Sequence, residues 1–339
     1  MALSVYLLPA LLSALIVLTV LPLWIRKAHK ISLIWDDMNK IHSPKVAGSG
    51  GVVVVLGFVI GILSIVTMTV FLYPQYNLLI EILALLAVIL MLGIIGIIDD
   101  ILGWQHGGLS IRSRLVLIAL ASIPLIAINA GKSTIGLPFV GDVNLGILYP
   151  LLMIPIGIVG ATTTFNFLAG YNGLESGLGA LLILALGIVS YLTGHTILFA
   201  ISLSLVVGLL CFLLWNFVPA KVFPGNSLTY TIGGLTAALA ILGNFEKIAI
   251  FFFIPYIIET FLKLRGRLRM QSFGKPLPDG SLTLRYNKLY GLEHVAIYLM
   301  EKFNIRPTEI KVVLALWAFQ LIIILLGFAI FWQGIVSGT

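Results

Sequence analysis

The feature that most constrains this chain is an uncharged apolar run from Ile82 to Ile98, which ends in the adjacent aspartates Asp99 and Asp100. Its seventeen residues match the length of a helix that crosses the apolar core of a bilayer. Carboxylates at the end of such a helix are costly unless they are solvated, paired or bound to a cation. We therefore expect the polar part of the protein to converge on this pair from one face of a membrane.

The composition assigns the whole chain to the membrane. Hydrophobic residues make up 60% of the 339 residues and charged residues only 10%, whereas soluble domains contain roughly 25% charged residues. We predict an all-α integral membrane protein, a single polytopic domain over residues 1–339, whose first helix is retained and is not a removable signal. Ten apolar runs are predicted as transmembrane helices, over residues 3–25, 49–73, 78–98, 115–130, 146–165, 177–193, 196–217, 228–243, 248–263 and 312–332.

Ten helices place both termini on one side of the membrane and divide the loops between its two sides. Eighteen of the twenty Lys and Arg residues then fall on one side, and only Lys132 and Lys247 fall on the other. The positive-inside rule puts the basic loops in the cytoplasm and both termini outside. The net charge of +7 is therefore mostly an orientation signal, which argues against a nucleic-acid partner.

Two loops are expected to have structure of their own. The longest cytoplasmic loop, about 264–311, contains a segment at 293–303 whose pattern predicts an amphipathic helix at the membrane interface. The outer loop 131–145 has the pattern of a short hairpin and carries no obvious chemistry.

Polar groups of two kinds meet at the predicted cytoplasmic face. Asp99 and Asp100 are either solvated end charges or a pair that a divalent cation keeps ionised. The segment Asn166–Glu175 is rich in Asn and Gly. Asn oxygens suit a hard cation, Asn amides suit a nucleobase or a phosphate, and Gly permits close backbone approach. A plain Asn-Gly turn before a helix is the alternative.

Two further segments add an anion site and positive charge. Between Lys221 and Thr229, a Pro-Gly turn leads to Asn226 and Ser227 at a predicted helix start, whose free N–H groups can hold an anion. Phe223 in the same segment can stack on a flat ring; a capped helix is the alternative. Arginines can bind phosphate bidentately, although positive-inside charge explains most of them individually. Such groups at one face suit a metal-assisted transfer between a phosphorylated soluble substrate and a phosphorylated lipid.

Several segments resemble the polyprenyl-phosphate N-acetylhexosamine-1-phosphate transferases. They are GIIGIIDDILG, NFLAGYNGLESG, VFPGN, PKVAGSGG and GLSIRSR. The segments LAGYNGLESG and AILGNFEKIAIFFFIPYI are most similar to the dolichyl-phosphate GlcNAc-1-phosphate transferase branch of eukaryotes and archaea. The similarity covers essentially all ten predicted helices, and it implies the family's fold of ten helices with a cytoplasmic active site.

The resemblance also implies roles for matching residues. The acidic pair lies at the metal and the lipid phosphate, and an Asn-rich loop with an aromatic ring forms a uracil pocket. Arg114 matches a phosphate-binding lysine, and Arg265 and Arg267 resemble arginines that hold the pyrophosphate and the N-acetyl sugar. The candidate residues are Asp99 and Asp100 as catalytic residues; Lys45, Arg114, Gly170, Asn172, Glu175, Phe223, Arg265, Arg267, Arg269 and His294 as substrate-binding residues; and Asn166, Asn226 and Asp100 as metal ligands.

The chain departs from the family pattern at three points. Asn226 stands where the family usually has a metal-binding Asp, so we expect its carbonyl oxygen to serve and Asn226→Asp to be tolerated or to improve metal affinity. Gly266 stands where the eukaryotic branch has a His between two arginines. The triple-His motif of bacterial relatives is absent, which leaves His294 in a comparable region.

The implied reaction is transfer of N-acetylglucosamine 1-phosphate from UDP-GlcNAc to dolichyl or another polyprenyl phosphate, with release of UMP. The implied cofactor is Mg²⁺, or Mn²⁺ in its place, and the implied role is the first step of N-glycan assembly. Family members are often homodimers, although the sequence marks no interface. Three alternatives stay open: another UDP-sugar donor, a transporter using Glu259 in the ninth predicted helix, and a non-catalytic family member.

The sequence also bears on the membrane in which the protein resides. Compact loops and the lack of a retention signal favour the plasma membrane of a prokaryote, and of an archaeon in particular. The endoplasmic reticulum membrane is the alternative location.

Overall fold

The computed structural model describes residues 4–72, 76–137 and 141–337. Residues 3 and 73, at the ends of two predicted spans, and 138–140, in the predicted hairpin, lie outside the described residues. The helices are α1 (Ser4–Lys30), α2 (Gly51–Phe71), α3 (Tyr76–His106), α4 (Ile111–Ala121), α5 (Ile123–Ala127), the π-helix η1 (Tyr149–Met153), α6 (Ile154–Phe165), α7 (Leu174–Leu192), α8 (Thr196–Asn216), α9 (Gly225–Gly243), α10 (Glu246–Phe252), α11 (Ile254–Arg265), α12 (Leu292–Lys302) and α13 (Glu309–Ser337).

Six of the described helices are long and apolar enough to cross a membrane, namely α1, α2, α3, α7, α8 and α13. They coincide with six of the ten predicted spans, and their exposed flanks carry large apolar side chains such as Leu11, Ile94 and Leu325. This arrangement confirms a mostly helical membrane protein. The count of ten spans stays a prediction.

Proline interrupts three of the other four predicted spans. The span at 115–130 is divided between α4 and α5 before Pro124, and the span at 248–263 is divided between α10 and α11 before Pro255. The span at 146–165 begins as η1, which contains Pro150, and continues as α6. Proline lacks the N–H that a helix interior requires, and Pro124, Pro155 and Pro255 are each the second residue of a new helix, α5, α6 and α11.

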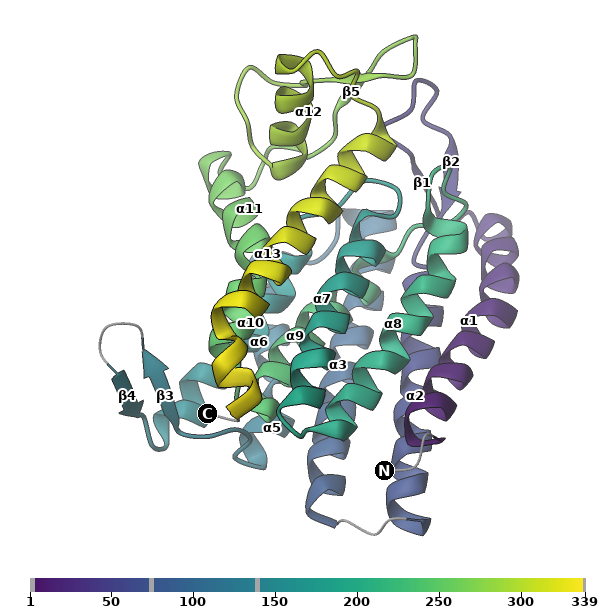
Figure 1. The fold of residues 1–339 in the computed structure, drawn as a ribbon. Coiled ribbons are helices and arrows are strands. Elements are labelled where there is room, and N and C mark those ends of the chain that lie inside the picture. The colour runs from purple at the N-terminus through teal and green to yellow at the C-terminus, as the bar shows by residue number, and fades with distance from the viewer. Residues whose placement is uncertain (1–3, 73–75, 138–140, 338–339) are drawn as a thin grey trace.

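Helix α9 lies at the centre of the bundle and is almost completely buried from Ser227 to Gly243. It packs against α2, α3, α6 and α7, and Figure 1 shows it enclosed by the longer helices. Small residues permit this close approach, as they do at helix interfaces in membranes. A Cβ atom at Gly233 would lie 2.6 Å from the Ala161 oxygen of α6. The centrality of α9 matters because its first turn forms part of the polar site.

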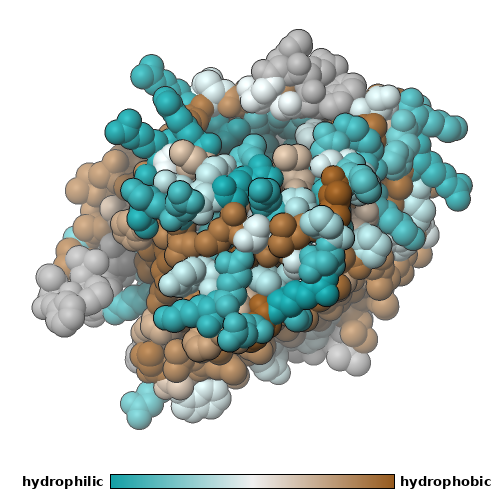
Figure 2. Space-filling view, turned by 90° about the horizontal axis from the view of Figure 1, so that it is seen from above, coloured by the Kyte–Doolittle hydropathy of each residue, from teal (hydrophilic) through white to brown (hydrophobic). Residues whose placement is uncertain are grey.

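The two ends of the bundle differ in polarity. Both ends of the described chain lie at the lower end in Figure 1, whereas α12, β1, β2 and β5 lie at the upper end. Seen from above, the upper face carries hydrophilic residues and the flanks are hydrophobic (Figure 2). We call this upper end the polar end. The side of the membrane on which the termini lie stays a prediction.

Three antiparallel strand pairs complete the fold. They are β1 (Ile34–Asp36) with β2 (Lys45–Ala47), β3 (Thr134–Leu137) with β4 (Gly141–Asn144), and β5 (Lys275–Pro276) with β6 (Leu282–Thr283). The β3–β4 pair confirms the predicted hairpin, and α12 confirms the predicted helix at 293–303. A bridge between Ala47 and Val222 ties the β1–β2 hairpin to the segment that precedes α9.

Candidate active site

A cavity of about 460 Å³ opens among the loops at the polar end of the bundle. Its walls come from the β1–β2 hairpin, the end of α3, the loop between α6 and α7, the start of α9 and the segment after α11. The lining residues are Trp35, Asp36, Asp37, Met38, Ser49, Asp99, Asp100, Gly103, Gly107, Asn166, Ala169, Gly170, Tyr171, Asn172, Glu175, Phe223, Pro224, Gly225, Asn226, Thr229 and Phe273. Both predicted catalytic residues and all three predicted metal ligands therefore share one cavity.

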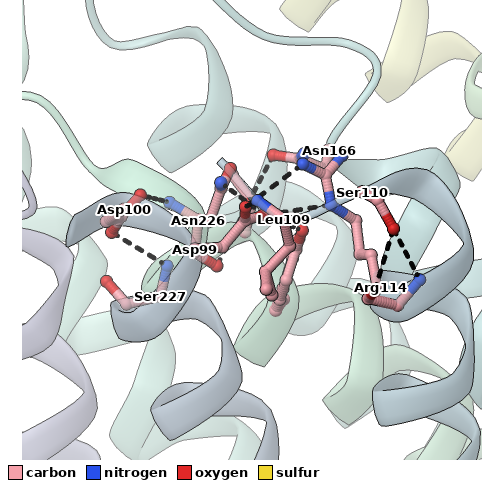
Figure 3. A network of polar contacts seen from close by, with 11 residues as sticks. Asp99, Asp100, Leu109, Ser110, Arg114, Asn166, Asn226 and Ser227 are labelled. Carbon is pink, nitrogen blue, oxygen red and sulfur yellow. Dashed lines mark hydrogen bonds and ion pairs between the residues drawn. The ribbon is translucent and has the colours of Figure 1, made fainter. Parts of the chain in front are cut away.

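Asp99 is held by donors on both carboxylate oxygens (Figure 3). Oδ1 accepts the backbone N–H of Leu109 at 2.8 Å and a guanidinium N–H of Arg114 at 3.2 Å. Oδ2 accepts the Tyr230 hydroxyl at 2.6 Å and the Asn226 amide at 3.0 Å, and it lies 3.0 Å from Nε of Arg114. With 1% of its surface exposed, this carboxylate is neutralised by arginine and has little capacity left for a further ligand.

The carboxylate of Asp100, a residue of α3, lies at the N-terminus of α9. The backbone N–H of Asn226 donates to its Oδ1 at 2.7 Å, and that of Ser227 lies 3.4 Å from Oδ2 (Figure 3). These are the N–H groups that the sequence suggested for an external anion, and the protein supplies that anion itself. The helix dipole and the N–H groups stabilise a negative charge here. One bond on each oxygen leaves acceptor capacity free on the cavity side.

Two glycines allow α3 and α9 to come this close. A Cβ atom at Gly96 of α3 would lie 2.6 Å from the Asn226 carbonyl oxygen, and one at Gly225 would collide with the Asp100 carboxylate. Gly225 also adopts a φ of +73°, in the left-handed region that favours glycine. The Pro-Gly turn before α9 is therefore required by the position of Asp100.

The loop between α6 and α7 brings the predicted amides to the opposite wall. Asn166 ends α6, and its Oδ1 accepts the Thr229 hydroxyl of α9 at 2.7 Å. Gly170 has a φ of +110° and donates its N–H to Glu175 at 3.0 Å. A Cβ atom at Gly170 would lie 2.8 Å from the Phe273 ring. Glu175 thus braces the loop internally, because its carboxylate is directed at the loop backbone.

The structure does not bring every predicted substrate-binding residue to the cavity. Lys45 forms an ion pair with Asp36 at 2.8 Å on the exposed edge of the β1–β2 hairpin. Arg265 ends α11, and Arg267 and Arg269 follow it; all three side chains are exposed and lie outside the set of residues that lines the cavity. Arg114 reaches the site through Asp99.

His294 is buried and does not line the cavity, but it contacts Phe273, which does. Its Nδ1 accepts the backbone N–H of Tyr290 at 3.3 Å, and its Nε2 lies 3.4 Å from the carbonyl oxygen of Phe273. Burial lowers the pKa of His294, and Lys263 and Arg285 lower it further, against the raising effect of the Phe273 carbonyl. A neutral ring with its proton on Nε2 satisfies both contacts. His294 therefore supports Phe273, whose ring lines the cavity.

Sequence reasoning missed part of the wall. Trp35, Asp37 and Met38 come from the loop after α1, and Phe273 comes from the long loop after α11. The available signal for the first group was the acidic pair Asp36-Asp37 in an otherwise basic loop. Phe273 carries no local signal, because its contact with Gly170 joins segments about a hundred residues apart.

The donor set fits one hard cation shared with a phosphate ligand. Asp100 and Asn166 offer oxygens to the cavity, and Mg²⁺ is commonly held by one or two carboxylates plus substrate phosphates and waters. Within the described residues no cluster of three or more His, Cys, Asp or Glu side chains forms a metal site by itself. Asp100 is the better ligand of the pair, because arginine and tyrosine already occupy Asp99.

Apolar helices around a bundle with a polar cavity at one end indicate a multi-pass membrane protein. The family model of glycosyl transferase family 4 matches residues 82–244. A Sulfolobus acidocaldarius protein that carries the name UDP-N-acetylglucosamine–dolichyl-phosphate N-acetylglucosaminephosphotransferase is 35% identical over 297 residues, 86% of this chain and 85% of its own length. The chain belongs to glycosyl transferase family 4.

Two other relatives show how widely this similarity extends. A Saccharolobus solfataricus protein of the same name is 34% identical over 318 residues, 93% of this chain and 94% of its own length. A Clostridium perfringens protein named phospho-N-acetylmuramoyl-pentapeptide-transferase is 31% identical over 175 residues, 50% of this chain and 55% of its own length. The similarity to the two archaeal proteins therefore extends over far more of the chain.

Proposed function

We propose that this protein transfers N-acetylglucosamine 1-phosphate from UDP-GlcNAc to dolichyl or another polyprenyl phosphate and releases UMP. The single observation that carries the proposal is the cavity at the polar end, where Asp100, Asn166, Asn172 and Phe223 meet. The names and coverage of the two archaeal relatives support the choice of substrates. We propose that this reaction is the first step of N-glycan assembly on a lipid carrier.

The reaction joins two phosphates and separates two others. An oxygen of the lipid phosphate attacks the phosphorus that bears the sugar, the bond between the two UDP phosphates breaks, and UMP leaves. The second pKa of a phosphate monoester is about 6, so the acceptor is mostly ionised at neutral pH. A general base and a covalent enzyme intermediate are therefore not required. Positioning and charge stabilisation supply most of the catalysis.

The residues of the chain divide these tasks. Phe223, Gly170 and Asn172 bind the uridine end of the donor, and Asp100 and Asn166 would hold Mg²⁺ or Mn²⁺. A cation bound there would neutralise charge that develops on the phosphate oxygens. Arg114 neutralises Asp99, so the acidic pair does not repel an anionic substrate with its full charge. The Asp100 carboxylate accepts the N–H of Asn226 at the N-terminus of α9 and lines the cavity.

The orientation in the membrane follows from the charge distribution. We propose ten membrane crossings, with both termini outside and with the basic loops and the cavity in the cytoplasm, where nucleotide sugars are made. The same-side placement of the chain ends in Figure 1 supports this topology. We propose a single polytopic domain in a prokaryotic plasma membrane, with a homodimer as the assembly common in the family.

Turnover of purified protein tests the proposed function directly. With labelled UDP-GlcNAc, a polyprenyl phosphate and Mg²⁺, we expect UMP and a labelled lipid in equal amounts. EDTA should abolish both products, and added Mg²⁺ or Mn²⁺ should restore them, because the described residues that line the cavity include no Lys or Arg that could neutralise the phosphates instead. Full activity in EDTA would overturn the metal assignment, and no turnover with any UDP-sugar would overturn the function.

A different donor is the second candidate. The Clostridium perfringens relative is named for a muramoyl-pentapeptide substrate, so members of related sequence differ in their sugars. The same assay with other UDP-sugars as competitors decides between donors by their kcat/KM. A transporter fits the cavity poorly, because transport sites usually lie near the membrane midplane and this cavity lies at the polar end.

Substitution of Phe223 tests the uridine end of the cavity. Its backbone is fixed on both sides, since its N–H donates to Ala47 at 2.8 Å and its carbonyl accepts from Gly50 at 2.9 Å. Loss of a ring that stacks on a base costs about 1–3 kcal/mol, so Phe223→Ala should weaken UMP binding about tenfold to a hundredfold. Calorimetric titration with UMP measures this change. Phe303→Ala, at an exposed ring after α12, is the matched control; equal affinities in all three proteins would contradict the assignment.

A further inference from the structure

Asn172 is fixed by two segments that lie far from it in the sequence. Its backbone N–H donates to Oε1 of Glu309 at 2.9 Å, and its side-chain amide donates to Oδ2 of Asp37 at 2.8 Å. Glu309 is the first residue of α13, and Asp37 follows β1. The last helix and the first cytoplasmic loop therefore meet at one residue of the cavity wall.

Lys40 joins the two acceptors. Its Nζ contacts Oε2 of Glu309 and lies 3.9 Å from Oδ2 of Asp37. Each carboxylate thus has one oxygen on Asn172 and is paired with the same ammonium group. Asn39 adds a further link, because its side-chain amide donates to the carbonyl oxygen of Gly170 at 2.9 Å. Residues 37–40 therefore hold the loop at two points, at Gly170 and at Asn172.

Burial raises the free-energy cost of losing any of these contacts. Asp37, Asn172 and Glu309 are each no more than 5% exposed, and a buried N–H or carboxylate without a partner costs free energy. Burial lowers the pKa of Lys40, and the charge of Asp37 opposes that shift. The lysine is needed as a cation here, because without it two buried carboxylates would face each other across Asn172.

We propose that Glu309, together with Lys40, is a positioning residue that holds Asn172 for the nucleotide end of the donor. The role assigned to Asn172 rests on the proposed function. Asn172 lines the cavity and its amide nitrogen is engaged by Asp37. Its orientation is therefore set by Asp37 in the cavity wall and by Glu309 and Lys40, which lie outside the set of lining residues. The α13 N-terminus thereby becomes part of donor recognition.

The expected result is a selective loss on the donor side. Glu309→Ala removes the acceptor of the Asn172 N–H and should raise KM for UDP-GlcNAc about tenfold or more. KM for the polyprenyl phosphate and kcat should change less than about twofold, because Asp100 and Asn166 keep their own contacts. Glu309→Gln retains an acceptor oxygen and should have a smaller effect. Lys40→Met leaves two buried carboxylates without their cation and should also raise KM for UDP-GlcNAc, and the Glu309→Ala/Lys40→Met double variant should be no worse than the worse single variant.

Hydrogen exchange supplies a readout that does not depend on turnover. The amide of Asn172 should exchange about tenfold faster in Glu309→Ala than in the wild type. Lys311→Gln, an exposed residue of the same helical turn whose Nζ contacts Arg306, is the matched control and should leave exchange and both KM values unchanged.

Each other result decides against the proposal or against the function separately. Unchanged exchange and unchanged donor KM in Glu309→Ala would overturn the role of Glu309. A parallel change of both KM values and kcat would mean a general structural role and would overturn it as well. If the wild type turns over no UDP-sugar, the proposed function fails, and the exchange comparison still decides whether Glu309 holds Asn172.

Discussion

Asp100→Asn is expected to lower kcat by about a hundredfold to a thousandfold while the protein remains folded and inserted. The variant keeps an oxygen that can accept the N–H of Asn226 at the start of α9. It loses the negative charge that we expect to bind the cation and to align it with the substrate phosphates. Turnover of purified protein at saturating UDP-GlcNAc and Mg²⁺ measures the loss.

Two comparisons give the Asp100 result its meaning. Asp279→Asn removes an exposed carboxylate that pairs with Arg306, far from the cavity, and should leave turnover unchanged. The Mg²⁺ concentration for half-maximal activity should rise in Asp100→Asn, because a neutral amide binds a hard cation less well. Near-normal turnover in that variant would remove Asp100 from the mechanism.

Asn226→Asp is expected to reduce activity at least about tenfold at neutral pH, because like charges at contact distance repel strongly in a buried site. The sequence alone suggested that this change would be tolerated or would improve metal affinity. In the structure the Asn226 amide donates to Asp99 at 3.0 Å. The introduced carboxylate would therefore face the carboxylate of Asp99.

The pH dependence identifies the cause. Two close carboxylates raise the pKa of one of them, so the proton that restores the lost hydrogen bond binds as the pH falls. The ratio of Asn226→Asp activity to wild-type activity should therefore increase from pH 7.5 to pH 6. Taking the ratio cancels effects of pH that are common to both proteins. A variant as active as the wild type at pH 7.5 would instead show that the extra carboxylate serves as a metal ligand.

Much of the architecture was accessible from local patterns. Long apolar runs predicted the six helices that are able to cross a membrane, and the pattern of residues 131–145 predicted the β3–β4 hairpin. The motifs around Asp99, Asn166 and Phe223 predicted residues that share one cavity. These predictions succeeded because apolar length and turn chemistry act within one segment. Proline positions were visible too, but whether each would kink or divide a span depends on packing.

The roles within the site were less accessible. Lys45 and the arginines after α11 looked equivalent to Arg114, yet only Arg114 contacts the acidic pair. Asp37, Lys40 and Glu309 had no pattern that linked them to Asn172. A hydrogen bond between residues more than a hundred positions apart has no trace in a single sequence, because the fold creates it.

The sequence by itself determined that this chain lies in a membrane and that its acidic pair follows a long apolar run, since burial of apolar length needs no knowledge of neighbours. The expectation that the helix ends at this pair is wrong, because α3 continues to His106. Only the tertiary structure decided how the pair divides its work. Arg114, Tyr230 and Asn226 occupy Asp99, whereas the N-terminus of α9 holds Asp100 open to the cavity. The two adjacent carboxylates differ in their partners, because Asp99 contacts side chains from α4 and α9, whereas Asp100 accepts backbone N–H groups of α9.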